Sequence, residues 1–123
     1  MIDIVGFRCF FAGDTGYDAD LFAEIGAVFP NMDLALLPIG AYDPRSLMFA
    51  MHVNPEEAVQ MHLDLAPRLS VGMHWGSFQL TDEPMDEPPQ RLQHACAQHG
   101  VSSTEFVVMQ HGEVLTLRVR QSE

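Results

Sequence analysis

The sequence predicts an α/β domain, in which short apolar strands alternate with amphipathic helices. The segment 33–40, DLALLPIG, is a continuous apolar run of strand length, as expected of a strand covered on both faces. Segments with helical periodicity and capping residues stand on both sides of it. Hydrophobic residues make up 47% of the 123 residues, enough for one modest core. The predicted order of elements is β-β-α-β-α-β-α-β-β.

The first elements are predicted at the amino-terminal end. Residues 2–11, IDIVGFRCFF, are rich in strand formers and interrupted by Gly6, which leaves open one bent strand or two short ones. A helix follows over about 20–28, because Asp18 can cap it and its apolar residues line one face.

The middle of the chain predicts a second helix and a further strand. Asn54, Pro55 and Glu57 supply an N-cap, a first-turn proline and the acid of a capping box, for a helix that reaches about Ala66. The segment 68–74, RLSVGMH, has the composition of the next strand.

The last part predicts a helix and a terminal hairpin. Two prolines, Pro88 and Pro89, open a helix that ends at Gly100. Its apolar face is lined by Leu92, Ala95, Cys96 and His99. The segments 105–109 and 113–119 flank a QHG turn, which indicates two paired strands.

The charge balance is strongly acidic and excludes several classes of partner. Six arginines, no lysine and seventeen acids give a formal charge of −11. This charge repels phosphate backbones and anionic membranes, so we expect no nucleic-acid binding. Cys9 and Cys96 form no metal or redox motif and are expected to be buried thiols. With no leader peptide and no long apolar segment, we expect a cytoplasmic protein without a transmembrane span.

Metal-ligand side chains follow predicted strands. Asp14 follows the first apolar run in FFAGDTGY, and His74 follows a later one in SVGMHWGSF. Ligands gather beyond the carboxyl ends of strands in α/β sheets, so these residues, with Tyr42 and His52, are predicted to converge on one rim. Carboxylate and imidazole suit Zn, Mn or Fe. The alternative is that Asp14 forms a turn and His74 is an ordinary strand-end histidine.

A family resemblance covers nearly the whole chain. FFAGDTGY, PIGAYDPRSLMFAMHVNPEEAVQMHLDL, GMHWGSFQLTDEPMDEPP and the terminal HGE occur in order. Together they resemble the carboxyl-terminal half of a metallo-β-lactamase-fold hydrolase. Within that fold the chain resembles the N-acylphosphatidylethanolamine-hydrolysing phospholipase D type and the L-ascorbate-6-phosphate-lactonase-like enzymes. The resemblance implies one half of an αββα sandwich, a mixed sheet with helices on one face, as a single partial domain over 1–123.

The resemblance also implies functional roles. Asp14 matches the carboxylate that bridges two metal ions, zinc in the complete family site with Mn or Fe as alternatives, and His74 matches a ligand of the second ion. His52 matches a catalytic histidine that contacts the substrate phosphate or polarises the scissile group. Tyr42 and Arg45 are implied to line the substrate pocket. The implied substrate is a phospholipid or a small phosphate ester, and the implied reaction is phosphodiester hydrolysis.

The remaining side chains are expected to have structural roles. Trp75 is expected to pack rather than to react. The other four histidines are expected to be structural or solvated: His62, His94, His99 and His111.

One departure limits what the isolated chain is expected to do. The family's His-x-His-x-Asp-His motif, which supplies further ligands, does not occur in these 123 residues. A catalytic zinc site needs about three protein ligands and a water, so we expect the isolated chain not to hydrolyse phosphodiesters. A half-fold would also expose one sheet face. That face predicts a homo-oligomer or pairing with a missing amino-terminal half, and the alternative function is a non-catalytic half-domain with a structural or dimer-forming role.

Overall fold

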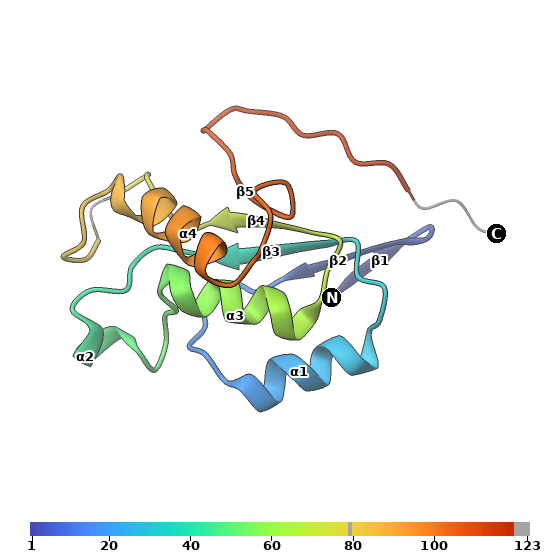
Figure 1. The fold of residues 1–123 in the computed structure, drawn as a ribbon, viewed down its shortest axis with the longest axis horizontal. Coiled ribbons are helices and arrows are strands. Elements are labelled where there is room, and N and C mark those ends of the chain that lie inside the picture. Colours follow the sequence, from blue (N-terminus) through green and yellow to red (C-terminus); the bar gives the residue numbers. More distant parts are fainter. Residues whose placement is uncertain (79, 120–123) are drawn as a thin grey trace.

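The fold is a five-stranded mixed sheet with helices against one face, which confirms the predicted α/β class. A computed structural model of the chain describes residues 1–78 and 80–119. The elements are β1 (Ile2–Ile4), β2 (Phe7–Phe11), α1 (Ala19–Val28), β3 (Leu34–Pro38), α2 (Arg45–Met48), α3 (Pro55–Leu65), β4 (Leu69–Met73), α4 (Glu87–Gln98) and β5 (Phe106–Val108) (Figure 1). No helix among the described residues is long and apolar enough to cross a membrane.

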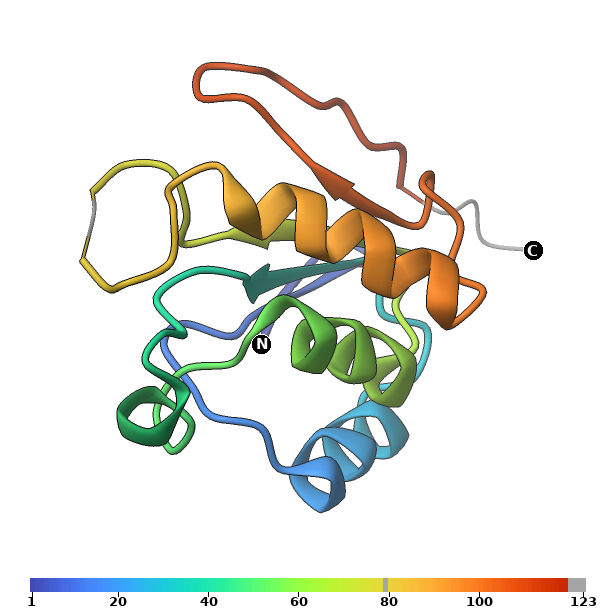
Figure 2. The ribbon, with the colours of Figure 1, turned by 60° about the vertical axis from the view of Figure 1, so that its left-hand side comes forward.

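The strands lie in the sheet in the order of the sequence, β1-β2-β3-β4-β5. β1 and β2 are antiparallel, which resolves the first apolar run into two strands joined at Val5 and Gly6. Both turn residues have positive φ, 45° and 79°, as a two-residue hairpin turn requires. The other neighbouring strands are parallel, and each crossover steps in the same direction across the sheet. Right-handed crossovers of this kind place their helices on the same face, and α1, α3 and α4 lie on one side of the sheet (Figure 2).

The helix termini confirm most of the predicted caps. Asp18 accepts a hydrogen bond from the Leu21 amide at the start of α1. Asn54 and Glu57 form the predicted reciprocal capping box of α3. α4 is followed by Gly100, whose φ of +69° ends the helix. The short helix α2 was not predicted, because its four residues are too few for a periodic pattern and no side chain caps it.

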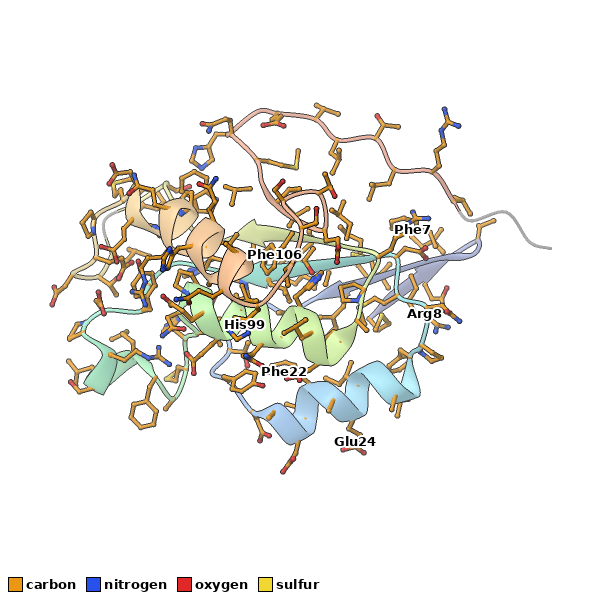
Figure 3. All side chains as sticks on the ribbon, viewed as in Figure 1. Phe7, Arg8, Phe22, Glu24, His99 and Phe106 are labelled. Atoms are coloured by element: carbon orange, nitrogen blue, oxygen red, sulfur yellow. The ribbon has the colours of Figure 1, made fainter. Side chains whose placement is uncertain are left out.

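The core lies between the helices and one face of the sheet. Ala35 and Leu37 of β3 are fully buried there. Figure 3 shows Phe22 pointing from α1 toward the neighbouring helix, while Glu24 points outward. No helix of residues 1–78 and 80–119 covers the opposite face (Figure 2), so the expectation that β3 is covered on both faces was wrong. The alternate residues Leu34 and Leu36 are only half-buried.

The carboxyl-terminal segment differs from the predicted hairpin. A turn forms as expected, with the Gln110 amide donating to Glu113 Oε1 and the Glu113 amide to the Gln110 carbonyl. The segment 113–119 is not a strand, so the second strand of the hairpin was wrong. The segment leaves β5 and reaches the far end of the sheet, where Arg68 Nη2 donates to the Arg118 carbonyl at 2.8 Å. This hydrogen bond to Arg68 is found where pairing with the segment 105–109 was expected.

Candidate metal centre

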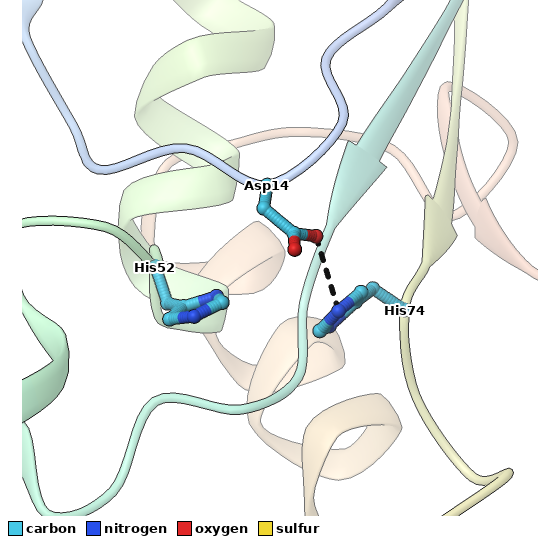
Figure 4. Close-up of side chains that lie close together, drawn as sticks. All are labelled: Asp14, His52 and His74. Atoms are coloured by element: carbon cyan, nitrogen blue, oxygen red, sulfur yellow. Dashed lines mark ion pairs between the residues drawn. The ribbon is translucent and has the colours of Figure 1, made fainter.

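Three predicted site residues converge at the carboxyl edge of the sheet. Asp14 follows β2, His52 follows α2 and His74 follows β4 (Figure 4). Each offers one ligand atom within 4.8 Å of those of the other two. His74 Nε2 lies 3.1 Å from Asp14 Oδ1, and the His52 and His74 rings stack with centroids 5.7 Å apart. The prediction that Asp14 and His74 converge is therefore confirmed, and His52 lies in the same group.

The loop that carries Asp14 is fixed on both sides. The Ala12 amide donates to the Leu36 carbonyl and continues the β2–β3 pairing. Gly16 packs so tightly on the 49–50 backbone that an added Cβ would lie 2.3 Å from the Ala50 carbonyl oxygen. Tyr17 donates its hydroxyl to Asp64 of α3 at 2.6 Å, and burial, helped by this bond, raises the pKa of Tyr17 to about 12. The Asp14 side chain is free to point at His74 and is 60% exposed.

His74 occupies a constrained turn directly after β4. Its φ of 62° lies in the left-handed region, which is uncommon for a histidine and indicates a backbone held by its surroundings. The Ile39 amide donates to the Met73 carbonyl at 2.9 Å, which extends the β3–β4 pairing up to the site. The His74 ring is 27% exposed and faces Asp14.

His52 is held through its backbone and has an unsatisfied ring nitrogen. Its amide donates to the Met48 carbonyl, and its own carbonyl accepts from Arg45 Nη1 at 2.8 Å. Nδ1 of His52 is buried and has no hydrogen-bond partner in the part of the chain that the structure describes. Such an orphaned nitrogen costs free energy unless a ligand, ion or water satisfies it.

The donor set fits a divalent cation. One carboxylate oxygen and two imidazole nitrogens are ligands that zinc and its neighbours accept. Metal–ligand bonds of about 2.0–2.2 Å in tetrahedral geometry place ligand atoms roughly 3.3–3.6 Å apart. The 3.1 Å between His74 Nε2 and Asp14 Oδ1 is close to that spacing, and the three ligand atoms lie within 4.8 Å of one another. The net charge of −11 also favours cation binding.

The predicted pocket residues Tyr42 and Arg45 lie outside this group. Tyr42 is fully buried and donates its hydroxyl to Glu87 at 2.6 Å, and burial raises the pKa of Tyr42 well above its usual value. Arg45 forms an ion pair with Glu57 of α3 in addition to its bond to the His52 carbonyl. Both side chains therefore hold the structure around the site, and their contact with a substrate stays a prediction.

Of the histidines expected to be structural or solvated, His111 lies next to the site. Its ring stacks on Trp75 with centroids 5.8 Å apart, and it lines a cleft of about 400 Å³ together with His74 and Phe78. This neighbourhood has no signal in the sequence, because the contact joins residues 36 apart and depends on how the 110–113 turn folds back. His94 is exposed on α4, as expected, and His99 is exposed directly after the helix, so the prediction that His99 lines its apolar face was wrong. Cys96 is buried as expected, whereas Cys9 is half-buried.

Comparison with known proteins places the chain in a family. Residues 1–75 match the beta-lactamase superfamily domain. The chain belongs to this superfamily and has the fold of a metallo-β-lactamase-type, metal-dependent hydrolase.

Three relatives show how much of the chain is similar to named proteins. N-acyl-phosphatidylethanolamine-hydrolyzing phospholipase D 1 of Caenorhabditis elegans is 40% identical over 109 residues, which cover 87% of this chain and 31% of the nematode protein. The mitochondrial enzyme of the same name from Saccharomyces cerevisiae is 44% identical, over 68% of this chain and 18% of the yeast protein. A metal-dependent hydrolase of Nitratidesulfovibrio vulgaris is 33% identical, over 91% of this chain and 41% of that protein. The chain thus spans less than half the length of each of these relatives.

Proposed function

We propose that this chain carries part of the centre of a zinc-dependent phosphodiesterase of the phospholipase D type. Its substrate is an N-acylphosphatidylethanolamine-like lipid or another phosphate ester. The observation that carries the proposal is the meeting of Asp14, His52 and His74 from three separate segments. The names of the nematode and yeast relatives support the substrate class.

The proposed roles follow from the chemistry of each side chain. Asp14 and His74 hold the metal, with Mn or Fe as alternatives to Zn, and the two oxygens of Asp14 allow it to bridge two ions. A bound metal would supply Lewis acidity and an activated water for attack on phosphorus. His52 contacts the substrate phosphate through its ring, which lies beside that of His74 with centroids 5.7 Å apart. Tyr42 and Arg45 shape the loop that borders the substrate.

The chain is proposed to form the carboxyl-terminal half of the αββα sandwich as one partial domain. The one-sided sheet and the short span of each relative support this assignment. Its partner is then either the complementary half of the fold or a second copy of this chain, and the cytoplasm stays the predicted location. One sheet face carries no helix in the described part of the chain, and Phe11 on it is 55% exposed; this face favours the second candidate function, a non-catalytic half-domain that acts as a dimer-forming module.

The test measures metal binding, phosphodiester binding and turnover with the purified chain. We expect weak zinc binding, line broadening of the ³¹P signal of dimethyl phosphate only when zinc is present, and no hydrolysis of a chromogenic phosphodiester. His52→Gln should remove the phosphate response and spare most of the zinc binding, because its proposed partner is the substrate. His94→Gln, an exposed change on α4, is the matched control and should alter neither.

The results of these measurements distinguish the phosphodiesterase centre from the non-catalytic half-domain. A chain that binds no zinc and is a stable dimer by light scattering would support the structural module and refute the metal centre. Turnover that disappears in Asp14→Asn would show that the chain is self-sufficient, contrary to the expectation that further ligands are needed.

A further inference from the structure

The segment 39–45, which follows β3, contacts both histidines of the candidate metal centre. At one end, Gly40 packs on His74 so closely that an added Cβ would lie 2.1 Å from the His74 carbonyl oxygen. At the other end, Arg45 donates to the His52 carbonyl. Figure 4 shows this stretch leaving β3 and continuing below His52 toward α2. The conformation of the segment therefore affects the positions of His52 and His74 together.

Glu83 holds the middle of that segment through its carboxylate. Oε2 accepts the Ala41 amide at 2.8 Å, and Oε1 accepts the amides of Tyr42 and Asp43 at 3.1 and 2.9 Å. The Thr81 hydroxyl lies 2.7 Å from each oxygen of the same carboxylate. These bonds outweigh the effect of burial and lower the pKa of Glu83, so it is ionised. Glu83 is only 8% exposed.

The bonds to Glu83 offset an unfavourable backbone conformation. Ala41 has a φ of 67°, a left-handed value that a residue with a Cβ adopts at a cost. Three consecutive amides directed at one carboxylate form a concave anion site of the kind that turns make. Ala41 and Tyr42 are buried, so their amides would lack a partner if the carboxylate were removed.

We propose that Glu83 is a positioning residue of the metal centre, acting through the 39–45 segment on His74 and His52. The inference rests on the proposed function for its metal, but the placement of the two rings is measurable without one. A glutamine at position 83 keeps the shape, yet its amide NH₂ would face backbone N–H donors. Loss of outer-shell support of this kind typically weakens metal affinity by about 10–100-fold.

The experiment compares the full chain with Glu83→Gln and with Asp86→Asn. Asp86 lies in the same acidic loop, is exposed and makes no capping hydrogen bond, so Asp86→Asn removes one charge without altering the bonds to 39–45. Ring signals of histidine-labelled, metal-free protein are assigned by single His→Gln variants. We expect the His52 and His74 signals to move in Glu83→Gln, those of the exposed His94 and His99 to stay, and neither pair to move in Asp86→Asn.

Zinc titration supplies the second readout. The zinc dissociation constant should rise by roughly tenfold or more in Glu83→Gln and stay near the wild-type value in Asp86→Asn. If Glu83→Gln does not fold by circular dichroism, Glu83→Asp keeps the charge on a shorter side chain, with a smaller shift expected. Unmoved His52 and His74 signals in a folded variant would overturn the inference. A wild-type chain that binds no zinc would refute the proposed metal centre, and the ring signals would still decide the role of Glu83.

Discussion

Two regions of the molecule bring a histidine close to an acid, and they differ in how completely the ring is satisfied. In the core, His62 of α3 is 4% exposed, with Nδ1 2.7 Å from Ser70 Oγ and Nε2 3.9 Å from Glu105 Oε2. At the sheet edge, His74 lies 3.1 Å from Asp14 and is 27% exposed. The ring of His52 beside it has a buried nitrogen without a partner among the described residues.

The difference separates a structural histidine from one that can bind a ligand. Burial lowers the pKa of His62 despite the attraction of Glu105, so the ring is neutral, and its nitrogens face groups of the protein itself. At the edge, Asp14 is exposed and the His74 ring is partly exposed, and no group of the described protein satisfies Nδ1 of His52, so this group can receive a ligand. Proximity of histidine and acid is common to both regions, and satisfaction of the ring nitrogens distinguishes them.

The sharpest test of this comparison is zinc binding. Asp14→Asn and His74→Gln each remove a proposed ligand, and the loss of affinity should exceed the roughly 10–100-fold caused by losing an outer-shell partner. His62→Gln changes the other region and should leave affinity unchanged. Isothermal titration with zinc, together with the visible spectrum of the cobalt-loaded chain, measures the effect.

The control for this test is that the variants keep the wild-type fold. Asp14 is 60% exposed and its substitution should not alter the circular dichroism spectrum. Equal zinc affinity in the Asp14→Asn variant and the wild type would refute the metal centre. A loss of zinc affinity in His62→Gln alone would mean that zinc binds in the core instead.

The second test measures the free energy of unfolding, for which the core histidine should matter more than the group at the sheet edge. His62→Ala leaves the Ser70 hydroxyl buried without its partner and creates a cavity, so the free energy of unfolding should fall by about 2–4 kcal/mol. Asp14→Ala, at the exposed edge, should change it by less than about 0.5 kcal/mol. Urea unfolding followed by circular dichroism measures both. A large loss in Asp14→Ala would mean that the edge group holds the fold, in which case its polar contacts are structural.

The sequence predicted the order of the main elements because each carries its own local signal. The capping box at Asn54 and the glycine after α4 act within one turn, and the apolar run at 33–40 has no competing helical periodicity. The coverage of β3 and the segment 113–119 were wrong for a different reason. Both depend on which parts of the chain pack on the second sheet face, and an apolar pattern alone does not specify them.

The part of the site that follows from the order and direction of the strands could be predicted from the sequence. Parallel strands end at one edge, so Asp14 and His74 could be placed together from their positions after strands. The role of Glu83 could not be found in this way, because it joins residues about 40 apart through backbone amides, whose placement depends on the left-handed turn at Ala41. The neighbourhood of His111 depends likewise on how a turn packs against Trp75.

The smallest expected effect is the pH dependence of stability due to His62. Burial lowers its pKa in the folded state below the ordinary value of 6.5, whereas the unfolded chain titrates at that value. As pH falls below about 6.5, the unfolded chain therefore binds more protons than the folded one, and the free energy of unfolding decreases. Carboxylates also titrate in acid, so the His62 contribution is isolated by comparing urea unfolding of wild type and His62→Gln at about pH 7.5 and pH 5. The stability advantage of the wild type should be largest at the higher pH and should shrink at the lower one, since glutamine cannot take up a proton. An advantage that grew on acidification would mean that the attraction of Glu105 dominates over burial, and that the histidine of the core is charged in the folded protein.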